Sequence, residues 1–430
     1  MNRISTSSRS ISDVLALLRS SREFREDVLV CARDIVREVA GGGDEAIIKY
    51  ARRFDGTVPD QLRVSEAQFE EAERHVGNEL REALHLAASN IGKFHRAQVP
   101  HPVEVQVTNG VLCRREWRAI DAVGLYVPGG SAPLVSTVLM LGIPAMIAGC
   151  SKIILCSPCR TLGKIPPEIL VAAQMVGISD VYQIGGAQAI AAMALGTSTV
   201  PRVHKIFGPG NQYVAAAKMI VALPPYGVSI DMVAGPSELM ILADELADPE
   251  WIAADLLSQA EHGIDSPVVL LSTSSTLLDE VEEAVSLQKG SLSRSAILQE
   301  SMNKSYAVLV DDLRTAIDIV NAYAPEHLIV STQEPARLIP EIRNAGSVFL
   351  GSLASVVFGD YASGTNHTLP TSGAAASMGG LTVESFMKPV TFQSLTREGF
   401  SALAPAVKTL ARAEGLDGHV NAVSVREGSI

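Results

Sequence analysis

The sequence has few of the features that mark nucleic-acid-binding, secreted or membrane proteins. Its 430 residues carry a formal net charge of −12, and Lys and Arg form no clustered run. Because binding to a phosphate backbone needs clustered basic side chains, this composition argues against a general nucleic-acid surface. Residues 1–13 are polar and lack the apolar segment of a secretory signal, which favours a reducing, cytoplasmic location.

Cysteine is also scarce, with five residues in the chain. Cys156 and Cys159 have the spacing of a CxxC motif, but no second pair is present to complete a zinc site. The segment also ends a predicted strand. We therefore expect these two cysteines to be structural and not redox-active or metal-binding.

One uncharged stretch, residues 124–151, is long enough to span a bilayer. Three prolines and a pair of glycines interrupt it, at Pro128, Gly129–Gly130, Pro133 and Pro144. We expect a strand, a loop and a helix of a buried core in this stretch, and no membrane segment.

The remaining pattern predicts an α/β protein. The first hundred residues have helical periodicity: Gly41 to Gly43 are expected to stop one helix, and Ser65 with Gln68 forms a capping-box start for another. From about residue 121, short apolar runs alternate with helical ones, which predicts right-handed βαβ units around mainly parallel sheets. The expected strands are 122–127, 152–156, 180–184, 203–207, 228–232, 239–243, 267–272, 306–310, 328–331 and 347–350.

Polar clusters hold four of the nine histidines. A helix is expected to begin at Asp248, which is placed as its N-cap, and to end before Gly263. Gln259 and His262 then lie three residues apart on one face, within reach of a single metal ion. The alternative is a histidine stabilised by the dipole at a helix end.

Two further clusters combine carboxylates with imidazoles. Glu326 and His327 follow Pro325 and offer two proton acceptors with different ordinary pKa values. Asp360 and His367 lie seven residues apart in a segment rich in turn-forming and polar residues, as in a binding loop. A solvated turn at Glu326 and a purely structural turn around Asp360 are the alternatives.

Two glycine-containing turns follow predicted strands. Gly185-Gly186-Ala187-Gln188 and Gly208-Pro209-Gly210-Asn211 each precede a helix and could hold phosphate groups. Neither matches G-x-G-x-x-G with an acidic residue about 20 positions later, so either turn could be a simple strand-to-helix connection. The residues alone thus predict a cytoplasmic α/β enzyme with a metal site, an acid/base pair and a nucleotide loop, and they do not select its reaction.

At these motifs the chain resembles the histidinol dehydrogenase family, and the resemblance covers nearly its whole length. Seven motifs occur in the expected order. They are Tyr126-Val127-Pro128-Gly129-Gly130, Phe207 to Asn211, Asp231 to Glu238, Gln259-Ala260-Glu261-His262, Ala324 to Leu328, Gly359-Asp360-Tyr361 through Thr371, and Glu414-Gly415-Leu416 with His419.

The resemblance implies the site residues and cofactors. It implies one Zn²⁺ per subunit and NAD as cofactors, with L-histidinol as substrate. Four protein ligands to zinc depart from the commoner catalytic pattern of three ligands plus water. The implied metal ligands are Gln259, His262, Asp360 and His419; the substrate contacts are Ser237, Gln259, His262, His327, Asp360, His367, Glu414 and His419; and the NAD contacts are Tyr126, Gln188 and Asn211.

The implied reaction oxidises L-histidinol to L-histidinaldehyde and then to L-histidine, the last steps of histidine biosynthesis, with two NAD reduced in succession. His327 is the implied acid/base and Glu326 the group that activates water in the second oxidation. A cysteine thioester is the alternative for aldehyde oxidation, but none of the five cysteines falls in a matched motif. Zinc is assigned to orienting the substrate more than to Lewis-acid catalysis.

The resemblance also implies the fold and the assembly. We expect two incomplete Rossmann-like domains with parallel sheets and helical terminal extensions, in a homodimer in which Glu414 and His419 complete the partner's site. The expected division is 1–22 as a helical arm, 23–124 with 236–380 as the domain of the metal and acid/base residues, 125–235 as the nucleotide domain, and 381–430 as a helical tail.

Other functions remain open at this point. A related dehydrogenase could act on another small polar alcohol, and a zinc hydrolase could use Glu326 with metal-activated water and no NAD. A non-catalytic scaffold would use neither residue. NADH formation from L-histidinol, at two equivalents per substrate, separates the first reading from these alternatives.

Overall fold

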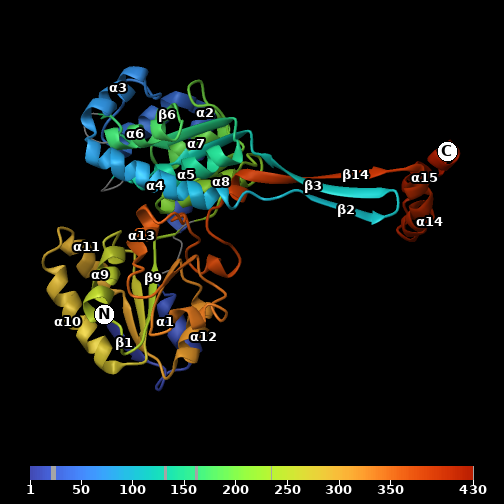
Figure 1. Ribbon diagram of the computed structural model, residues 1–430. Helices are drawn as coiled ribbons and strands as arrows, with labels where there is room; N and C mark the ends of the chain where they lie inside the picture. The colour runs from blue at the N-terminus through green and yellow to red at the C-terminus, as the bar shows by residue number, and fades with distance from the viewer. Residues whose placement is uncertain (21–25, 130–132, 160–162, 234, 430) are drawn as a thin grey trace.

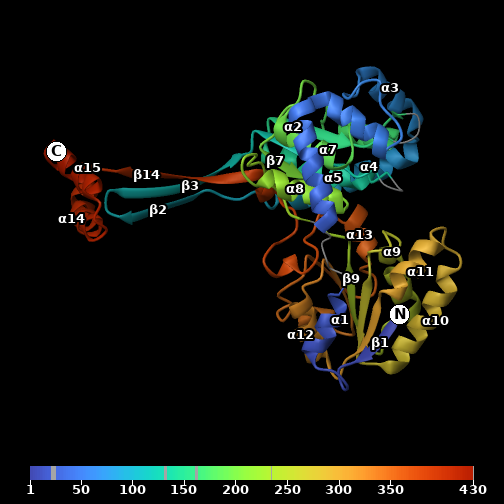
Figure 2. The same cartoon turned by 180° about the vertical axis from the view of Figure 1, so that it is seen from behind.

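Two parallel β-sheets form two lobes, and a long antiparallel ribbon projects from one of them in the computed structural model (Figures 1 and 2). The structure describes residues 1–20, 26–129, 133–159, 163–233 and 235–429. Gly130 and Ala234, which belong to two of the seven motifs, lie outside the described residues. Among the described residues, no helix combines the length and apolar character that a membrane crossing requires.

The five-stranded lobe has helices on both faces of its sheet. In sheet order the strands are β6 (Asp180–Gln183), β5 (Lys152–Ser157), β4 (Ala122–Tyr126), β7 (Lys205–Phe207) and β8 (Ser229–Ile230), all parallel. One face packs against α3 (Glu66–His75), α4 (Asn78–Arg96), α5 (Val135–Ala148) and α6 (Pro167–Met175). The other packs against α2 (Glu26–Phe54), α7 (Gly186–Leu195) and α8 (Gln212–Ala222).

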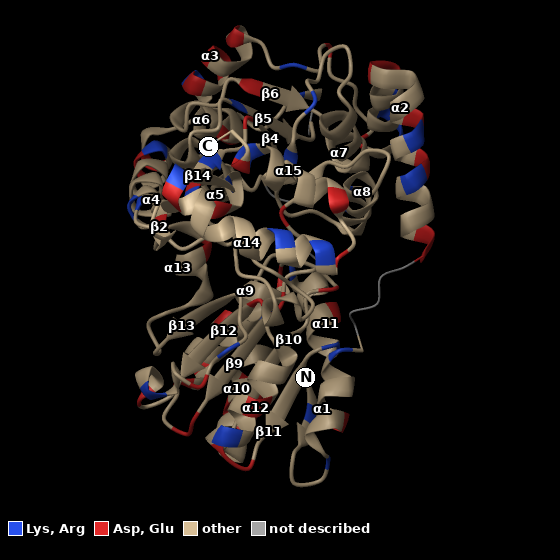
Figure 3. Cartoon of the chain, turned by 90° about the vertical axis from the view of Figure 1, so that its right-hand side faces the viewer, with Lys and Arg blue, Asp and Glu red and all other residues tan. Residues whose placement is uncertain are grey.

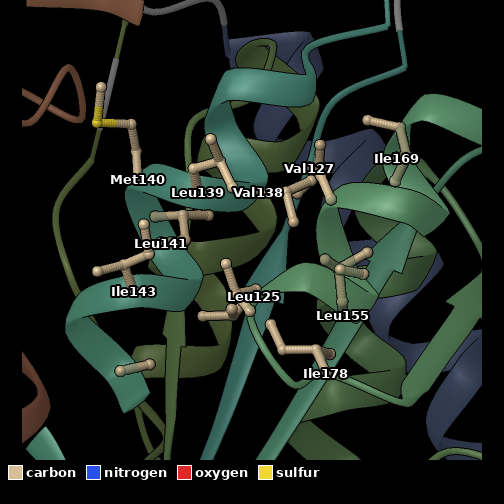
Figure 4. Close-up of a cluster of buried hydrophobic side chains, with 14 of the residues drawn as sticks. Leu125, Val127, Val138, Leu139, Met140, Leu141, Ile143, Leu155, Ile169 and Ile178 are labelled. Carbon is tan, nitrogen blue, oxygen red and sulfur yellow. The ribbon is translucent and has the colours of Figure 1, made fainter. Parts of the chain in front are cut away.

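The core under α5 explains why the uncharged stretch is not a membrane segment. Leu139, Met140 and Leu141 are buried against Leu125 of β4 and Leu155 of β5 (Figure 4). Burial of these side chains removes apolar surface from water, which is the main favourable term in folding. The long apolar run therefore forms part of the core between one face of the sheet and the helices that cover it.

The six-stranded lobe repeats the layered plan with different helices. Its parallel strands, in sheet order, are β1 (Asn2–Ser5), β11 (Tyr306–Leu309), β10 (Val268–Ser272), β9 (Leu239–Ala243), β12 (His327–Ser331) and β13 (Ser347–Leu350). One face packs against α9 (Pro249–Ala260), α10 (Ser275–Lys289) and α11 (Ser295–Asn303). The other packs against α1 (Ile11–Leu18) and α12 (Leu313–Tyr323).

A ribbon of three antiparallel strands leaves the five-stranded lobe and carries the C-terminal helices at its far end (Figure 1). The ribbon is formed by β2 (Val103–Thr108), β3 (Val111–Ala119) and β14 (Met387–Leu395), followed by α14 (Arg397–Ala413) and α15 (Asp417–Glu427). The remaining short elements are α13 (Val356–Tyr361), η2 (Pro335–Leu338), η3 (Ala374–Ala376) and η4 (Val383–Phe386).

The structure confirms most of the predictions made from local sequence patterns. The α/β class is confirmed, and each of the ten expected strands is present with small differences at its ends. The Ser65 capping box is formed, with Gln68 Oε1 accepting the Ser65 N–H at 2.9 Å. Helical geometry is interrupted at Gly43 as expected: its φ of 51° separates two helical stretches at a kink within α2. Acidic and basic side chains alternate along the outer face of this helix (Figure 3).

The expected domain division differs from the structure in the assignment of residues 26–124 and in the nature of both terminal segments. Residues 26–96 pack on the five-stranded sheet and not on the sheet of the acid/base residues, and β4 belongs to that same five-stranded sheet. Helical periodicity identifies an apolar face but does not say which sheet covers it. The 1–22 arm is also not purely helical, because β1 pairs with β11 as an edge strand.

The C-terminal tail is likewise not purely helical. All nine residues of β14 pair with β3, from Met387 opposite Ala119 to Leu395 opposite Val111. The expected helical tail therefore begins with a strand, and the two helices follow it. β2 and β3 lie between residues 100 and 121, a segment to which the sequence analysis assigns neither helix nor strand, and they too are strands that it does not predict.

Candidate active site

A cleft of about 390 Å³ lies between the two lobes and is lined by both. The five-stranded lobe contributes residues that follow β4 and β7, including Pro128, Thr137 and Asn211. The six-stranded lobe contributes residues that directly precede its strands: Ser237 before β9, His262 before β10, and Glu326 before β12. Residues from α13 and the segment after it, including Asp360 and His367, also line the cleft.

α9 begins and ends as its sequence predicts. Asp248 Oδ1 accepts the N–H groups of Glu250 at 2.9 Å and Trp251 at 3.3 Å, so the N-cap is formed. The helix ends at Ala260, and His262 follows it at the cleft wall. Gln259 in the last turn is 1% exposed, and neither atom of its side-chain amide has a hydrogen-bond partner among the described residues.

Glu326 and His327 form a buried pair at the start of β12, so the alternative of a solvated turn is wrong. Each is 4% exposed. Glu326 Oε2 accepts the Glu238 N–H at 2.8 Å and lies 3.4 Å from His327 Nδ1. The chain enters this strand through Ala324, whose φ of 54° is in the left-handed region, followed by Pro325.

Asp360 lies on the other side of the His327 ring. Its Oδ1 is 3.6 Å from His327 Nε2, and that nitrogen has no hydrogen-bond partner within the described chain. Burial alone would lower the pKa of His327, but the Glu326 and Asp360 carboxylates outweigh it and raise this pKa to about 10. Burial would raise the pKa of Asp360, whereas the nearby His327 imidazole holds it below the usual range.

The His367 side chain contacts residues on both sides of the cleft. Its Nδ1 is 2.9 Å from the Asp360 backbone oxygen, and its Nε2 is 3.2 Å from Thr137 Oγ1 on α5. Burial lowers the pKa of His367, and also that of His262, against the opposing effect of the Asp360 carboxylate. Neutral imidazoles of this kind are suited to metal binding and substrate contacts.

The predicted NAD contacts lie at the carboxyl ends of strands in the five-stranded lobe. Asn211 caps α8, accepting the N–H groups of Tyr213 and Val214, both at 3.1 Å, and it lines the cleft. Tyr126 and Gln188 are buried near the β4 and β6 ends, where the Tyr126 hydroxyl accepts the Gly186 N–H at 3.0 Å. Of the three, only Asn211 is among the described residues that line the cleft.

Glu414 and His419 are not brought to this cleft within one chain. Glu414 caps the end of α14 and His419 lies in α15, both exposed at the far end of the ribbon (Figure 1). Accordingly, the described part of the single chain contains no group of three His, Cys, Asp or Glu side chains placed to hold a metal ion.

The residues that remain at the cleft nevertheless fit a zinc ion chemically. His262 and Asp360 line the same cleft, and the buried, unpartnered amide of Gln259 lies one turn before His262. A buried polar group without a partner is costly, and a metal ligand role would supply the missing interaction. Nitrogen and oxygen donors of these types are normal zinc ligands, with the amide the least common.

Two contributors to the site escaped the sequence reading. Glu238 was quoted within a motif but given no role; its backbone N–H and oxygen contact Glu326 and His327, and its carboxylate accepts the Tyr323 hydroxyl and the Ser372 N–H, both at 3.0 Å. A charged residue directly before the fully apolar β9 was an available signal. Thr137, within an apolar helix, offered no comparable signal.

The fold and cleft define a two-lobed α/β enzyme with a buried carboxylate–imidazole pair beside a set of potential metal ligands. The family model described as "Histidinol dehydrogenase" matches residues 18–427. The chain therefore belongs to the histidinol dehydrogenase family. Members of this family are zinc- and NAD-dependent oxidoreductases of histidine biosynthesis, and this chain is such an enzyme.

Individual relatives agree over nearly the full length. A histidinol dehydrogenase of Bacteroides fragilis is 50% identical over 401 residues, covering 93% of each chain, and one of Aliivibrio fischeri is 50% identical over 400 residues, covering 93% of this chain and 90% of the relative. The crystal structure of histidinol dehydrogenase from Elizabethkingia anophelis has a TM-score of 0.95 and 44% identity, covering 100% of this chain and 98% of that one. The hydrolase and scaffold alternatives are thereby set aside.

Proposed function

We propose that His327 and Glu326 divide the proton transfers of two successive oxidations, from L-histidinol through L-histidinaldehyde to L-histidine. The observation that supports this division is the geometry of the pair: two buried proton-accepting groups 3.4 Å apart at one end of the cleft. The free His327 Nε2 is available to a substrate, while Nδ1 is held near the Glu238 oxygen at 3.3 Å.

In the first oxidation, His327 Nε2 accepts the hydroxyl proton of the alcohol while the adjacent carbon gives up a hydride to NAD⁺. The aldehyde carbon then receives the hydroxyl group of a water molecule whose other proton passes to Glu326, while His327 returns its proton to the carbonyl oxygen, and a hydrate forms. His327 then accepts a hydroxyl proton of the hydrate as its carbon gives up the second hydride to a second NAD⁺, and the resulting acid ionises to the carboxylate. Two NADH thus form for each substrate and one water is consumed.

The metal ligands in this proposal are Gln259, His262 and Asp360, with His419 supplied by a second chain. Bound zinc supplies two nitrogen-binding positions that would hold the imidazole and amine of the substrate. Asp360, once engaged as a ligand, would raise the pKa of His327 less than its free carboxylate does. Ser237 and His367 would contact the substrate, and Glu414 of a second chain would complete its surroundings.

A cysteine thioester is disfavoured as the route for aldehyde oxidation. The described lining of the cleft includes no cysteine. Burial raises the pKa of Cys150 to about 11 and of Cys159 to about 12, and it also raises the pKa of Cys156, so their thiolates are scarce at neutral pH. Cys31 lies in α2 and Cys113 in the ribbon.

The substitution Glu326→Gln tests the division of roles. We expect the variant to form L-histidinaldehyde and one equivalent of NADH, with the second oxidation slowed by about 10²- to 10⁴-fold. The measurement is NADH per substrate in single turnover, with the aldehyde trapped by a hydrazine reagent. Wild-type yield of two equivalents at an unchanged rate would contradict the role of Glu326.

The ribbon supports a homodimer as the assembly. Its strands expose alternating apolar side chains, with Val103 43%, Val105 50% and Val107 58% exposed, and Leu410 of α14 is 65% exposed. Such a surface, far from the body of its own chain, is suited to covering another copy. We propose that Glu414 and His419 reach the partner's cleft in this way.

Mixed dimers test this assembly. A His419→Ala chain mixed with a Glu326→Gln chain would regain one intact site in each heterodimer, and part of the wild-type activity would return. Absence of any recovery in verified heterodimers would contradict a shared site. A cytoplasmic location is also proposed, and it agrees with the presence of all five cysteines as free thiols.

A further inference from the structure

A buried ion pair lies behind the cleft, outside the acid/base and metal groups. Lys218 of α8 pairs with Asp231, which follows β8, and both side chains are 2% exposed. Lys218 Nζ also donates to the Gly208 backbone oxygen at 2.9 Å, and Asp231 Oδ2 accepts the Gly208 N–H at 2.7 Å. Both polar groups of the Gly208 backbone are therefore held by one ion pair.

Gly208 begins the segment that enters the cleft. Its φ of 119° is unfavourable for other residues, and a β-carbon added to it would lie 2.1 Å from the Tyr126 backbone oxygen. The next three residues, Pro209, Gly210 and Asn211, line the cleft. The pair thus fixes the first residue of the segment that carries the proposed NAD contact Asn211.

Asp231 of the same pair also contacts the connection between the two lobes. Asp231 Oδ1 accepts the Met232 N–H at 2.6 Å, and this residue begins the connection to the six-stranded lobe. Gly235, Pro236 and Ser237 of that connection line the cleft, and the Gly235 N–H donates to Thr371 Oγ1 at 2.5 Å. One ion pair therefore contacts the beginnings of two cleft-lining segments.

Stability alone is a poor explanation for such a pair. Taking two charges out of water costs free energy that their attraction only partly returns, and apolar residues of similar volume often serve a fold equally well. An apolar pair could not, however, bind the N–H and oxygen of Gly208. The hydrogen bonds to the backbone are what the charged side chains add.

We propose that Lys218 and Asp231 are positioning residues that hold the Gly208–Asn211 segment in the shape that binds the dinucleotide. The pair then sets the affinity for NAD and leaves proton transfer at His327 unaffected. This inference rests on the proposed assignment of Asn211 to the cofactor.

Two double variants separate positioning from simple packing. K218M/D231N removes both charges but keeps an oxygen that can accept the Gly208 N–H, whereas K218M/D231L fills the space and has no acceptor. We expect K218M/D231L to bind NADH about tenfold more weakly than K218M/D231N, with an equal rise in the KM for NAD, because the two variants differ in the acceptor for the Gly208 N–H. Its kcat and KM for histidinol should stay within about twofold of wild type.

Separate controls test the stability of the fold and the assignment of Asn211 to the cofactor. NADH affinity is measured by fluorescence titration without histidinol, and thermal unfolding is followed for each protein. Val221→Ala, which truncates a fully buried side chain at the far end of α8, should lower Tm and leave NADH affinity unchanged. Asn211→Ala should weaken NADH binding; if it does not, the cofactor assignment fails.

The outcomes decide the inference directly. If Asn211→Ala weakens NADH binding while both double variants bind like wild type, the pair is structural only and the inference is overturned. Equal weakening in both double variants overturns the role of Asp231, because the acceptor for the Gly208 N–H would then be irrelevant. If K218M/D231L does not fold, K218M/D231N alone gives the test, because it lacks the Lys218 donor to the Gly208 oxygen, and unchanged NADH affinity in that variant would overturn the inference.

Discussion

The two sheets turn opposite ends toward the shared cleft. The five-stranded sheet presents its carboxyl ends, from which β4 and β7 lead into the N-termini of α5 and α8. The six-stranded sheet presents its amino ends, where the C-terminal ends of α9 and α12 lead into β10 and β12. A helix N-terminus favours an anion and a C-terminus favours a cation, so one layered plan gives two opposite electrostatic surroundings.

This difference matches the two cofactors of the family. A dinucleotide carries negative phosphates and suits the five-stranded side, whereas a zinc ion suits the six-stranded side. The proposed acid/base pair follows the same division, because the buried Glu326 and His327, with Glu238 beside them, belong to the six-stranded lobe. The comparison teaches that opposite ends of similar parallel sheets can face one cleft and bind opposite charges.

The largest expected effect comes from removing the base of the six-stranded side. His327→Asn should lower kcat for both oxidations by about 10²- to 10⁴-fold, because the alcohol and the hydrate lose their proton acceptor. Stopped-flow NADH formation from histidinol and from histidinaldehyde measures the two steps. NADH affinity should remain at the wild-type value. The matched control is His85→Asn on an exposed face of α4, which should leave both rates unchanged. Loss of NADH binding in His327→Asn would contradict the assignment of proton transfer and cofactor binding to different lobes.

Within a single chain, metal binding should depend on the six-stranded side of the cleft and not on the five-stranded side. His262→Ala removes a proposed ligand at the end of α9 and should reduce zinc affinity by at least about tenfold. Elemental analysis after dialysis reports the zinc content, and fluorescence titration reports NADH binding. Zinc retention at wild-type occupancy would refute His262 as a ligand, and a parallel loss of NADH affinity would show that the two sides are not independent.

A half-buried carboxylate of the five-stranded lobe should make stability depend on pH. Burial raises the pKa of Asp55, at the end of the five-stranded lobe's α2, to about 6 from 3.8. The folded state therefore binds this proton more tightly than the unfolded state, so its stabilising contribution is full below about pH 3.8 and is lost as pH rises through about 6.

The substitution Asp55→Asn removes that dependence. At pH 7.5 we expect the free energy of unfolding of this variant to exceed that of wild type by about 1 kcal/mol, a value reduced from the full pKa shift because part of the side chain is exposed. Near pH 4 the two proteins should be equally stable. Denaturant unfolding at several pH values measures the difference. Asp60→Asn, at an exposed position nearby, is the control; a constant difference across the pH range would contradict the cause.

The smallest expected effect comes from the support of the acid/base pair. Tyr323→Phe removes the hydroxyl that donates to the Glu238 carboxylate at 3.0 Å. We expect a loss of about 1 kcal/mol in the free energy of unfolding and a fall of a few-fold in kcat, with NADH affinity unchanged. Urea unfolding and steady-state rates test this, and an unaltered kcat would show that Glu238 does not need this contact to position Glu326.

Local signals in the sequence were sufficient for much of this fold. Asp248 and Ser65 start their helices as expected because capping depends on neighbouring residues alone. The apolar strands were recognised because parallel strands covered on both faces are nearly continuously hydrophobic. Gln259, Glu326 and Asp360 were singled out through motifs, and the structure places His262, Glu326, His327, Asp360 and His367 around one cleft.

What the sequence did not predict depends on contacts between distant segments. The apolar faces of α2 to α4 do not specify which sheet they cover, so these helices were assigned to the wrong lobe. Val103, Val105 and Val107 alternate as in a strand, yet they are exposed in the single chain. The sequence likewise does not indicate that Glu414 and His419 lie at the end of a ribbon, because their distance from the cleft is set by strand pairing.

The ribbon has a consequence for how its tip can change. β3 and β14 pair continuously over nine residues, so the length of this ladder sets the distance of α14 and α15 from the five-stranded lobe. Inserting two residues in each strand would advance the tip by about 7 Å, while one residue in each would turn every outward side chain inward. The ribbon can therefore be lengthened in steps of two residues per strand without changing which face each side chain occupies, and such a change does not alter either lobe.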